Sequence, residues 1–321
     1  MNKIKRCLIA AAGALFLSTS FAQSWPSQPI RVINPYAPGG FGDTVAKPMF
    51  DQLAQSLGQP IIIESRAGAN GTLASNAAAK ANPDGHTFLI ANLGPIAMNP
   101  ALYPSNSVDP LKAFTAVTQI VSGPLIILAH PDFPAKTFPE LMKYARENPG
   151  KVSYGSVGPG STTHLAGELL ALKGNLEMLH VPFKGAAPVL NNLLGNQVDI
   201  GIVNISLAKP YIDSGRLRPI AVTTLNRSSV LPDVPAIAES LPGFEVNPWW
   251  GLVAPAGTPP EIINKVEQEL IRILKVPAIA DGFRANGLEP EGTTSADFTK
   301  RIAADTELWK EVVKTNKITL Q

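Results

Sequence analysis

Three observations lead us to predict an α/β protein of two domains. The chain has 321 residues, more than the roughly 150 residues of an average domain. Short apolar strands alternate with helices in two stretches, residues 29–91 and 125–224, and such alternation indicates parallel sheets covered by helices. Each stretch also holds a glycine-rich loop between a strand and the next helix. Hydrophobic residues make up 45% of the chain and charged residues 16%, which excludes a disordered protein.

The first stretch predicts strand, helix, strand, helix and strand. The strands are expected at residues 29–36, 60–64 and 87–91, and the helices at residues 44–57 and 73–80. Asp43 is a suitable N-cap for the first helix, and Pro48 inside that helix predicts an irregular first turn. The unbroken run of Ile61, Ile62 and Ile63 is typical of a strand that is buried on both faces.

The second stretch predicts another α/β unit, and helices follow it. Strands are expected at residues 125–129, 152–155, 179–182, 198–203 and 219–224, and helices at 138–147, 163–172, 189–194 and 207–214. Residues 258–261 have the Thr-x-x-Glu form of a capping box and open an amphipathic helix. The apolar stripe of that helix is Ile262, Ile263, Val266, Leu270, Ile273 and Leu274. Two further helices, at 276–285 and 295–314, have little strand beside them, so we expect them to pack onto a sheet formed earlier.

Residues 1–22 have the features of a cleavable secretory signal. A basic segment at 2–6 precedes an apolar run at 7–17, and Ala22 ends a small-residue cleavage site. The run is shorter than the about 20 residues needed to cross a bilayer, so no membrane anchor is expected. Cys7 is the sole cysteine and precedes the apolar run, which argues against a lipid anchor and leaves the mature chain without a thiol.

The charge balance excludes an electrostatic nucleic-acid binder. Lys and Arg number 27 against 25 Asp and Glu, a net charge of +2, whereas nucleic-acid binders are strongly basic. Removal of the signal takes away three cations and no acid, which leaves 24 against 25. This near-neutral chain without cysteine gives no reason to expect more than a monomer.

Two glycine-rich loops indicate a ligand site. Residues 36–43 (YAPGGFGD) and 155–162 (GSVGPGST) each join a strand to a helix. Glycine lets the backbone approach a ligand, and the unpaired N–H groups of a helix N-terminus favour an anion. Ser161 and Thr162 could add hydroxyl donors, and Ser161 stands where a Walker loop carries lysine. A carboxylate therefore fits better than a nucleoside triphosphate, although a plain tight turn remains the alternative for either loop alone.

The sequence offers little for catalysis or metal binding. The four histidines are His86, His130, His164 and His180. None has the spacing of a metal site, and no Gly-x-Ser-x-Gly motif occurs. We expect His164 to orient the second loop, because nothing supplies the third member that a Ser161–His164 catalytic pair would need.

Three features lie near expected strand ends. Asn204 follows a strand and is expected to face the cleft, whereas Asp199 is expected to be a solvated or capping acid. The aromatic pair Trp249 and Trp250 could wall a ligand pocket or belong to the core. Both readings of the tryptophan pair stay open at this point.

Eight short segments in a fixed order carry a family resemblance. They are residues 38–43 (PGGFGD), 64–71 (ESRAGANG), 83–87 (PDGHT), 99–103 (NPALY), 154–168 (YGSVGPGSTTHLAGE), 180–185 (HVPFKG), 231–235 (LPDVP) and 251–259 (GLVAPAGTP). Each segment is weak evidence alone, but their order is specific. Over essentially the whole mature chain, the sequence resembles the extracytoplasmic solute receptors of tripartite tricarboxylate transporters, the Bug family of TctC-type receptors.

The resemblance implies a type II periplasmic binding protein, in which two α/β domains joined by crossing strands close on a ligand. Crossings near residues 122–124 and 246–248 would give a first domain of residues 23–123 with 247–321 and a second of residues 124–246. In the family, the two glycine loops hold one ligand carboxylate. These loops correspond here to Pro38, Gly39, Gly40, Phe41, Ser161 and Thr162, with His164 beside them.

The resemblance places the far end of the ligand near Asn204 and Ser206, and the loops around Asn92 and Trp250 are expected to face the same pocket. Many relatives carry Asp where this chain has Asn204, and an amide cannot pair with an amino group as a carboxylate does, so amino-acid ligands are disfavoured. Residues 92–95 (NLGP) replace a hydroxyl-rich stretch of the relatives and make the expected pocket more apolar.

We therefore expect a periplasmic receptor that captures a small organic carboxylate by domain closure and delivers it to membrane permease subunits. No catalytic residue, cofactor, metal or nucleic-acid partner is expected. One alternative is a receptor that signals to a membrane sensor, and another is a secreted hydrolase that uses His164.

Overall fold

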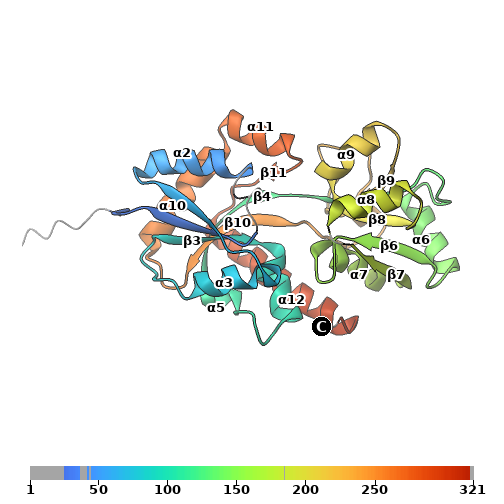
Figure 1. Cartoon of the computed structure of the whole chain (residues 1–321), viewed down its shortest axis with the longest axis horizontal. Coiled ribbons are helices and arrows are strands. Elements are labelled where there is room, and N and C mark those ends of the chain that lie inside the picture. Colours follow the sequence, from blue (N-terminus) through green and yellow to red (C-terminus); the bar gives the residue numbers. More distant parts are fainter. Residues whose placement is uncertain (1–24, 37–41, 43–44, 184, 319–321) are drawn as a thin grey trace, which may run out of the picture.

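The computed structural model describes residues 25–36, 42, 45–183 and 185–318, so the expected signal segment lies outside it. Two α/β units lie side by side and are joined by strands that run between them (Figure 1). The first sheet has the order β11-β4-β10-β3-β1-β2 and the second the order β7-β6-β8-β5-β9. The first sheet consists of β1 (Ile30–Asn34), β2 (Ile61–Ser65), β3 (Thr87–Asn92), β4 (Phe114–Ser122), β10 (Trp249–Pro255) and β11 (Glu289–Pro290). The second consists of β5 (Leu125–Ala129), β6 (Val152–Ser156), β7 (Met178–Pro182), β8 (Ile200–Asn204) and β9 (Arg218–Val222).

Helices cover both sheets. With the first sheet are α2 (Lys47–Leu57), α3 (Thr72–Ala79), α4 (Asn99–Leu102), α5 (Pro110–Ala113), α10 (Pro260–Leu274), α11 (Pro277–Ala285) and α12 (Ser295–Thr315). With the second are α6 (Phe138–Glu147), α7 (Thr162–Gly174), α8 (Ala186–Leu194) and α9 (Ile205–Asp213). Shorter helical turns are η3 (Ala69–Gly71), η4 (Gly94–Met98) and η5 (Ile237–Glu239). Among the described residues, no helix combines the length and the apolar character that a membrane crossing requires.

The sheets are mixed, although the sequence predicted parallel strands. In the first sheet, β1 pairs in parallel with β2 and β3, as expected. The strand β10, however, lies antiparallel between β3 and β4, and the sequence analysis identified neither β4 nor β10 as a strand. In the second sheet, β6 is parallel to β7 and β8, whereas β5 is antiparallel to β8 and β9.

Two features of the first unit differ from the sequence prediction. Helix α2 begins at Lys47 instead of residue 44, and Asp43, the expected N-cap, lies outside the described residues. Pro48 consequently falls in the first turn, where its missing N–H removes no helical hydrogen bond. The strand with three isoleucines is the edge strand β2, and Ile62 is 55% exposed.

The expected capping box before α10 does not form. The Thr258 hydroxyl donates to the Pro255 carbonyl at 2.8 Å, and Pro259 occupies the N-cap position. The predicted apolar stripe of this helix is nevertheless its buried face, residue for residue. Helices α10 and α12 both contact β4, which confirms that the C-terminal helices pack onto a sheet formed from earlier strands.

The two segments that join the sheets are bonded to each other. Strand β4 ends at Ser122 and β5 begins at Leu125, and the Gly123 N–H between them donates to the Pro248 carbonyl at 2.7 Å. On the side of the second sheet, the Thr223 hydroxyl donates to the Val246 carbonyl at 2.6 Å. The return segment is thus held on both sides of Asn247.

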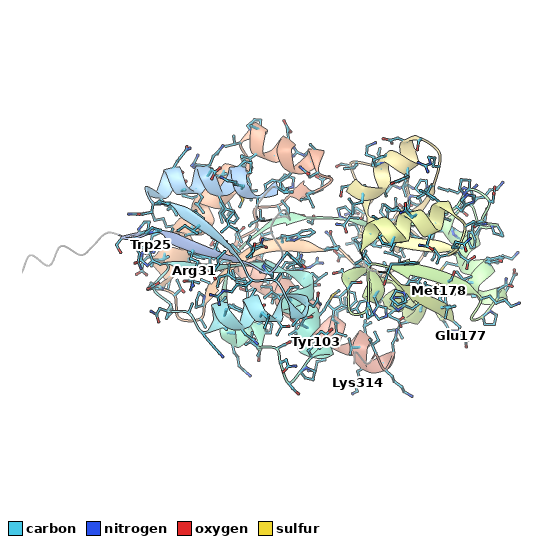
Figure 2. All side chains as sticks on the ribbon, viewed as in Figure 1. Trp25, Arg31, Tyr103, Glu177, Met178 and Lys314 are labelled. Carbon is cyan, nitrogen blue, oxygen red and sulfur yellow. The ribbon has the colours of Figure 1, made fainter. Side chains whose placement is uncertain are left out.

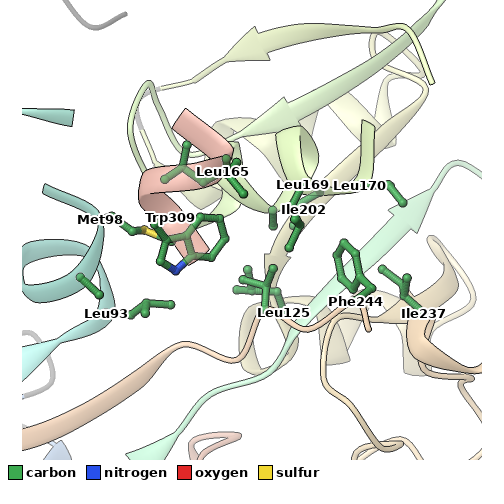
Figure 3. Close-up of a cluster of buried hydrophobic side chains, with 14 of the residues drawn as sticks. Leu93, Met98, Leu125, Leu165, Leu169, Leu170, Ile202, Ile237, Phe244 and Trp309 are labelled. Atoms are coloured by element: carbon green, nitrogen blue, oxygen red, sulfur yellow. The ribbon is translucent and has the colours of Figure 1, made fainter. Parts of the chain in front are cut away.

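Helix α12 extends from the first unit to the second. Trp309 lies between Leu93 and Met98 on one side and Leu165 of α7 on the other (Figure 3). At the C-cap of this helix, the Asn316 amide donates to the Glu168 carboxylate at 2.9 Å. One continuous hydrophobic cluster therefore includes side chains from both sheets.

We predict that Gly251→Ala lowers the free energy of unfolding by about 1–3 kcal/mol, because overpacking forces neighbours apart. A Cβ at Gly251, in the centre of β10, would lie 2.4 Å from the Phe298 ring and 2.7 Å from the Thr118 carbonyl oxygen. The matched control is Gly282→Ala in α11, where a Cβ meets no atom within 4 Å, and which should add about 0.5–1 kcal/mol. Urea denaturation of both variants measures the two changes, and equal effects would contradict the packing argument.

Candidate functional site

A cavity of about 270 Å³ lies where strand ends of the two sheets face each other. Its lining residues are Tyr36, Asn70, Asn92, Gly94, Leu125, Val157, Ser161, Thr162, Thr163, Asn204, Pro248 and Trp250. Tyr36 follows β1 and Val157 follows β6, whereas Asn92 and Asn204 are the last residues of β3 and β8. Ligand sites of α/β proteins form beyond the carboxyl ends of strands, and this cavity has that position in both units.

Three larger hollows lie elsewhere. One of about 620 Å³ runs along α12 beside Lys314, one of about 860 Å³ lies beside the end of α7 near Glu177, and one of about 380 Å³ lies beside α11 near Arg284. Lys314 and Glu177 mark the first two on the periphery of the molecule in Figure 2. None of the three is lined by residues of the two glycine-rich loops, so the smaller cavity is the better candidate for a ligand site.

The second glycine loop begins helix α7 at the cavity. Ser161 is the N-cap: its hydroxyl oxygen accepts from the His164 N–H at 3.2 Å, and its proton goes to the Gly158 carbonyl at 2.6 Å. The expectation that Ser161 offers a hydroxyl donor to the ligand is therefore corrected, because that proton is already bonded within the loop. The N–H groups of Thr162 and Thr163 belong to the first turn, where a helix provides no internal acceptor.

Two histidines support this loop from behind. The Nδ1 atom of His164 accepts from the Gly160 N–H at 3.0 Å, so His164 orients the loop as the sequence suggested. His164 is only 7% exposed and is not among the residues that line the cavity. The His180 ring stacks on it with 3.9 Å between ring centroids. Burial lowers the pKa of His164, and burial together with His164 lowers the pKa of His180 to about 4, so both rings are neutral at pH 7.

The opposite wall of the cavity depends on Asn92. Its amide donates to the Trp249 carbonyl at 2.8 Å, and its Oδ1 atom accepts from the Tyr36 hydroxyl at 2.7 Å. Burial raises the pKa of Tyr36, which keeps this hydroxyl protonated. Four other predicted residues of this wall, Pro38, Gly39, Gly40 and Phe41, lie outside the described residues.

The remaining predicted residues separate into lining and non-lining positions. Asn204 and Trp250 line the cavity, whereas Ser206 packs against Gly287, whose added Cβ would lie 2.7 Å from the Ser206 Cβ. Each member of the tryptophan pair fits one of the two interpretations, core or pocket wall, because successive side chains of β10 point to opposite faces. Trp249 is fully buried and donates to Asp305 at 2.7 Å, while Trp250 reaches the cavity.

Asp199 has a structural role. Its carboxylate accepts from both the N–H and the hydroxyl of Ser153, each at 2.7 Å. It therefore joins β6 to the segment before β8, so the expectation of a solvated or capping acid is wrong.

Several lining residues were not predicted from the sequence, namely Asn70, Gly94, Leu125, Val157, Thr163 and Pro248. Leu125 and Pro248 belong to the crossing segments, whose position beside the cavity follows from the topology. Asn70 lies within the quoted segment 64–71 and has a left-handed backbone conformation, with φ of 49°, which asparagine tolerates better than most residues. An asparagine directly before Gly71 in a glycine-rich segment was the available signal.

The described lining carries no ionisable side chain except the neutral Tyr36. Amides, hydroxyls and the N-terminus of α7 provide its polarity, and Leu125, Val157, Pro248 and Trp250 provide its apolar surface. Helix N-termini and free N–H groups stabilise an anion without a cationic side chain. Within the same described ranges, no cluster of three histidine, cysteine or acidic residues is placed to hold a metal ion.

Two α/β units around a neutral cavity with free helix N–H groups define a solute-binding protein of the periplasmic type. A family model described as the tripartite tricarboxylate transporter family receptor matches residues 45–318, so the chain belongs to that family. Its members are periplasmic receptors.

Individual relatives agree with this assignment. The protein BugT of Bordetella pertussis is 32% identical over 315 residues, which cover 96% of each chain. The Rpa4515 protein of R. palustris, solved with adipate, is 33% identical, with a TM-score of 0.77 over 92% of this chain and 99% of that one. MatC of Rhodopseudomonas palustris, solved with bound malate, is 33% identical, with a TM-score of 0.74 over 90% of this chain and 100% of that one.

We predict that Asn92→Ala lowers the free energy of unfolding by about 2–3 kcal/mol, because it leaves the Tyr36 hydroxyl and the Trp249 carbonyl unpaired. Tyr36→Phe removes one of these bonds and leaves Asn92 its contact with the Gly94 N–H, so its expected cost is about 1 kcal/mol. Urea denaturation compares the two variants. A larger loss in Tyr36→Phe would contradict the role assigned to Asn92.

Proposed function

We propose that this protein is a periplasmic receptor that captures a small organic carboxylate and delivers it to the permease subunits of a tripartite tricarboxylate transporter. The observation that carries the proposal is the N-terminus of α7 at a cavity without charged lining among the described residues. Such a site favours an anion small enough to be held by N–H groups, amides and hydroxyls.

The relatives support a carboxylate as the ligand class. Adipate and malate, the molecules named with two of the solved relatives, are both carboxylates. A carboxylate group accepts hydrogen bonds, and the cavity of this chain supplies uncharged donors for them. One ligand carboxylate would meet the N–H groups of Thr162 and Thr163 together with residues 38–41 of the first loop, and Asn92, Asn204 and Trp250 would face the rest of the molecule.

Capture would proceed by movement of two domains about the crossing segments. We assign residues 23–123 with 247–321 to the first domain and residues 124–246 to the second. The ligand contacts both, so it binds the closed arrangement better than the open one and shifts the equilibrium toward closure. This mechanism needs no covalent step, and the protein is proposed to have no enzymatic activity.

Thermal unfolding with a ligand panel tests the proposal. The protein from Gln23 to Gln321 is unfolded, freed of bound ligand, refolded and heated with monocarboxylates, dicarboxylates, tricarboxylates, aromatic acids and amino acids. A ligand at 100 times its dissociation constant adds about 2.7 kcal/mol to the stability, which raises the midpoint measurably. A selective shift with one carboxylate class is the expected result, and a folded protein that responds to none of them would overturn the carboxylate receptor.

Uptake measurements test the delivery step. Deletion of the receptor gene should abolish uptake of the carboxylate that the thermal experiment selects, and deletion of the permease subunits should have the same effect. Normal uptake without the permease subunits would instead favour a receptor that signals to a membrane sensor.

We predict that Asn204→Asp weakens carboxylate binding by about 100-fold, because a second negative charge about 6 Å from the ligand costs nearly 3 kcal/mol at an effective dielectric constant of 20. Asn191→Asp on the exposed side of α8 adds the same charge away from the cavity and is the matched control. Isothermal titration calorimetry measures both. Equal affinities of the two variants would place the ligand elsewhere.

A further inference from the structure

The stacked pair His164 and His180 lies directly behind the second glycine loop. The rings belong to α7 and β7, with 3.9 Å between centroids and an interplanar angle of 15°. His164 accepts from the Gly160 N–H, and the Nε2 atom of His180 lies 2.7 Å from the Ser156 hydroxyl. The same hydroxyl accepts from the Gly158 N–H at 3.2 Å. Each ring thus holds a different part of the loop.

These hydrogen bonds require a neutral His164. A ring nitrogen that accepts from a backbone N–H carries no proton, so the proton of neutral His164 is on Nε2, 3.7 Å from the Glu168 carboxylate. If Nδ1 is also protonated, two donors face each other at Gly160 and the bond that anchors the loop is lost. A charged His180 would add a second cation stacked on the first.

The surroundings oppose this charge. Besides the two histidines, the ionisable groups in contact with the pair are Tyr154 of β6, which stacks on His180, and Glu168 of α7. The Tyr154 hydroxyl and the amide of Asn316, after α12, both donate to Glu168, so part of its negative charge is already compensated. Burial of the rings outweighs the remaining attraction, and the pKa values of both histidines are lowered.

We propose that the stacked His164–His180 pair positions the second glycine loop for ligand capture and that acid releases the ligand by charging this pair. The inference rests on the proposed carboxylate site at the N-terminus of α7. Both histidines are positioning residues, because neither lines the cavity. Loss of the hydrogen bond between the Gly160 N–H and His164 turns the N–H groups of Thr162 and Thr163 away from the ligand carboxylate.

The direction of the pH effect follows from the pKa shift. The unfolded chain takes up a proton on His180 near pH 6.5, whereas the folded protein takes it up only near a pKa of about 4, and burial lowers the pKa of His164 in the same direction. Stability is therefore lost as the pH falls through this interval. At pH 3.5, His180 with a pKa of about 4 is neutral in about one quarter of the molecules, and only this quarter can keep both rings uncharged, so the affinity falls about fourfold.

The test compares the native protein with the double variant His164→Asn, His180→Gln. Asparagine places an acceptor near the position of Nδ1 and glutamine places a polar group near that of Nε2, and neither titrates. Affinities for adipate and malate are measured at pH 7 and pH 3.5, with near-ultraviolet circular dichroism to verify folding. Titration of adipate or malate itself affects both proteins equally, so the native protein should lose about fourfold more affinity than the double variant.

A control variant and a measurement without ligand complete the test. His130→Gln changes a histidine just beyond the other end of β5 and should retain the acid loss. Hydrogen exchange at the Gly160 amide, corrected for the intrinsic pH dependence, should show lost protection at pH 3.5 in the native protein and retained protection in the double variant.

Each outcome decides between the two proposals. Equal Gly160 protection at both pH values, or equal affinity losses in the native protein and the double variant, would overturn the role of the histidine pair. Failure of every carboxylate to bind at pH 7 would overturn the proposed function, and the exchange measurement would still decide whether the pair anchors the loop.

Discussion

The antiparallel contact between the two crossing segments is the constraint on which the rest of the structure depends. Strands β4 and β10 pair within the first sheet, and beside this pair the Gly123 N–H donates to the Pro248 carbonyl. These segments determine where the second sheet begins and where the chain returns. Leu125, Pro248 and Trp250 line the cavity because they are next to this contact. The floor of the site and the connection between the units are therefore the same piece of backbone.

Hydrogen bonds and ion pairs extend from this contact to the cavity wall and to helix α12. The successive members are Tyr36, Asn92, Trp249, Asp305, Arg301 and Glu245. Burial raises the pKa of Asp305, which Arg301 opposes, so the buried carboxylate depends on its cationic partner. Glu245 lies just before the return crossing. The wall that faces a ligand is thus mechanically connected to the segment about which the units would move.

The sequence predicted local features well and long-range features poorly. The stripe of α10 and the helix at residues 138–147 agree with the structure because side-chain periodicity is a local property. The exposure of Ile62 depends on which strand ends the sheet, and the bond that engages Ser161 depends on the fold of its loop. Asn92, Asn204 and Trp250 were found because motif order locates strand ends, whereas Leu125 and Pro248 required the crossing topology.

The strand order also determines which of the two units can fold first during synthesis. All five strands of the second sheet lie within one continuous stretch, from β5 to β9, so that sheet can form as soon as residue 222 is available. The first sheet has a gap between β3 and β4 until β10 arrives, and its covering helices α10 to α12 come last of all. Domains generally fold as units, and pairings between distant segments form slowly. During synthesis from the N-terminus, the first unit therefore stays incomplete, with apolar surface exposed, until its C-terminal strands and helices have been synthesised.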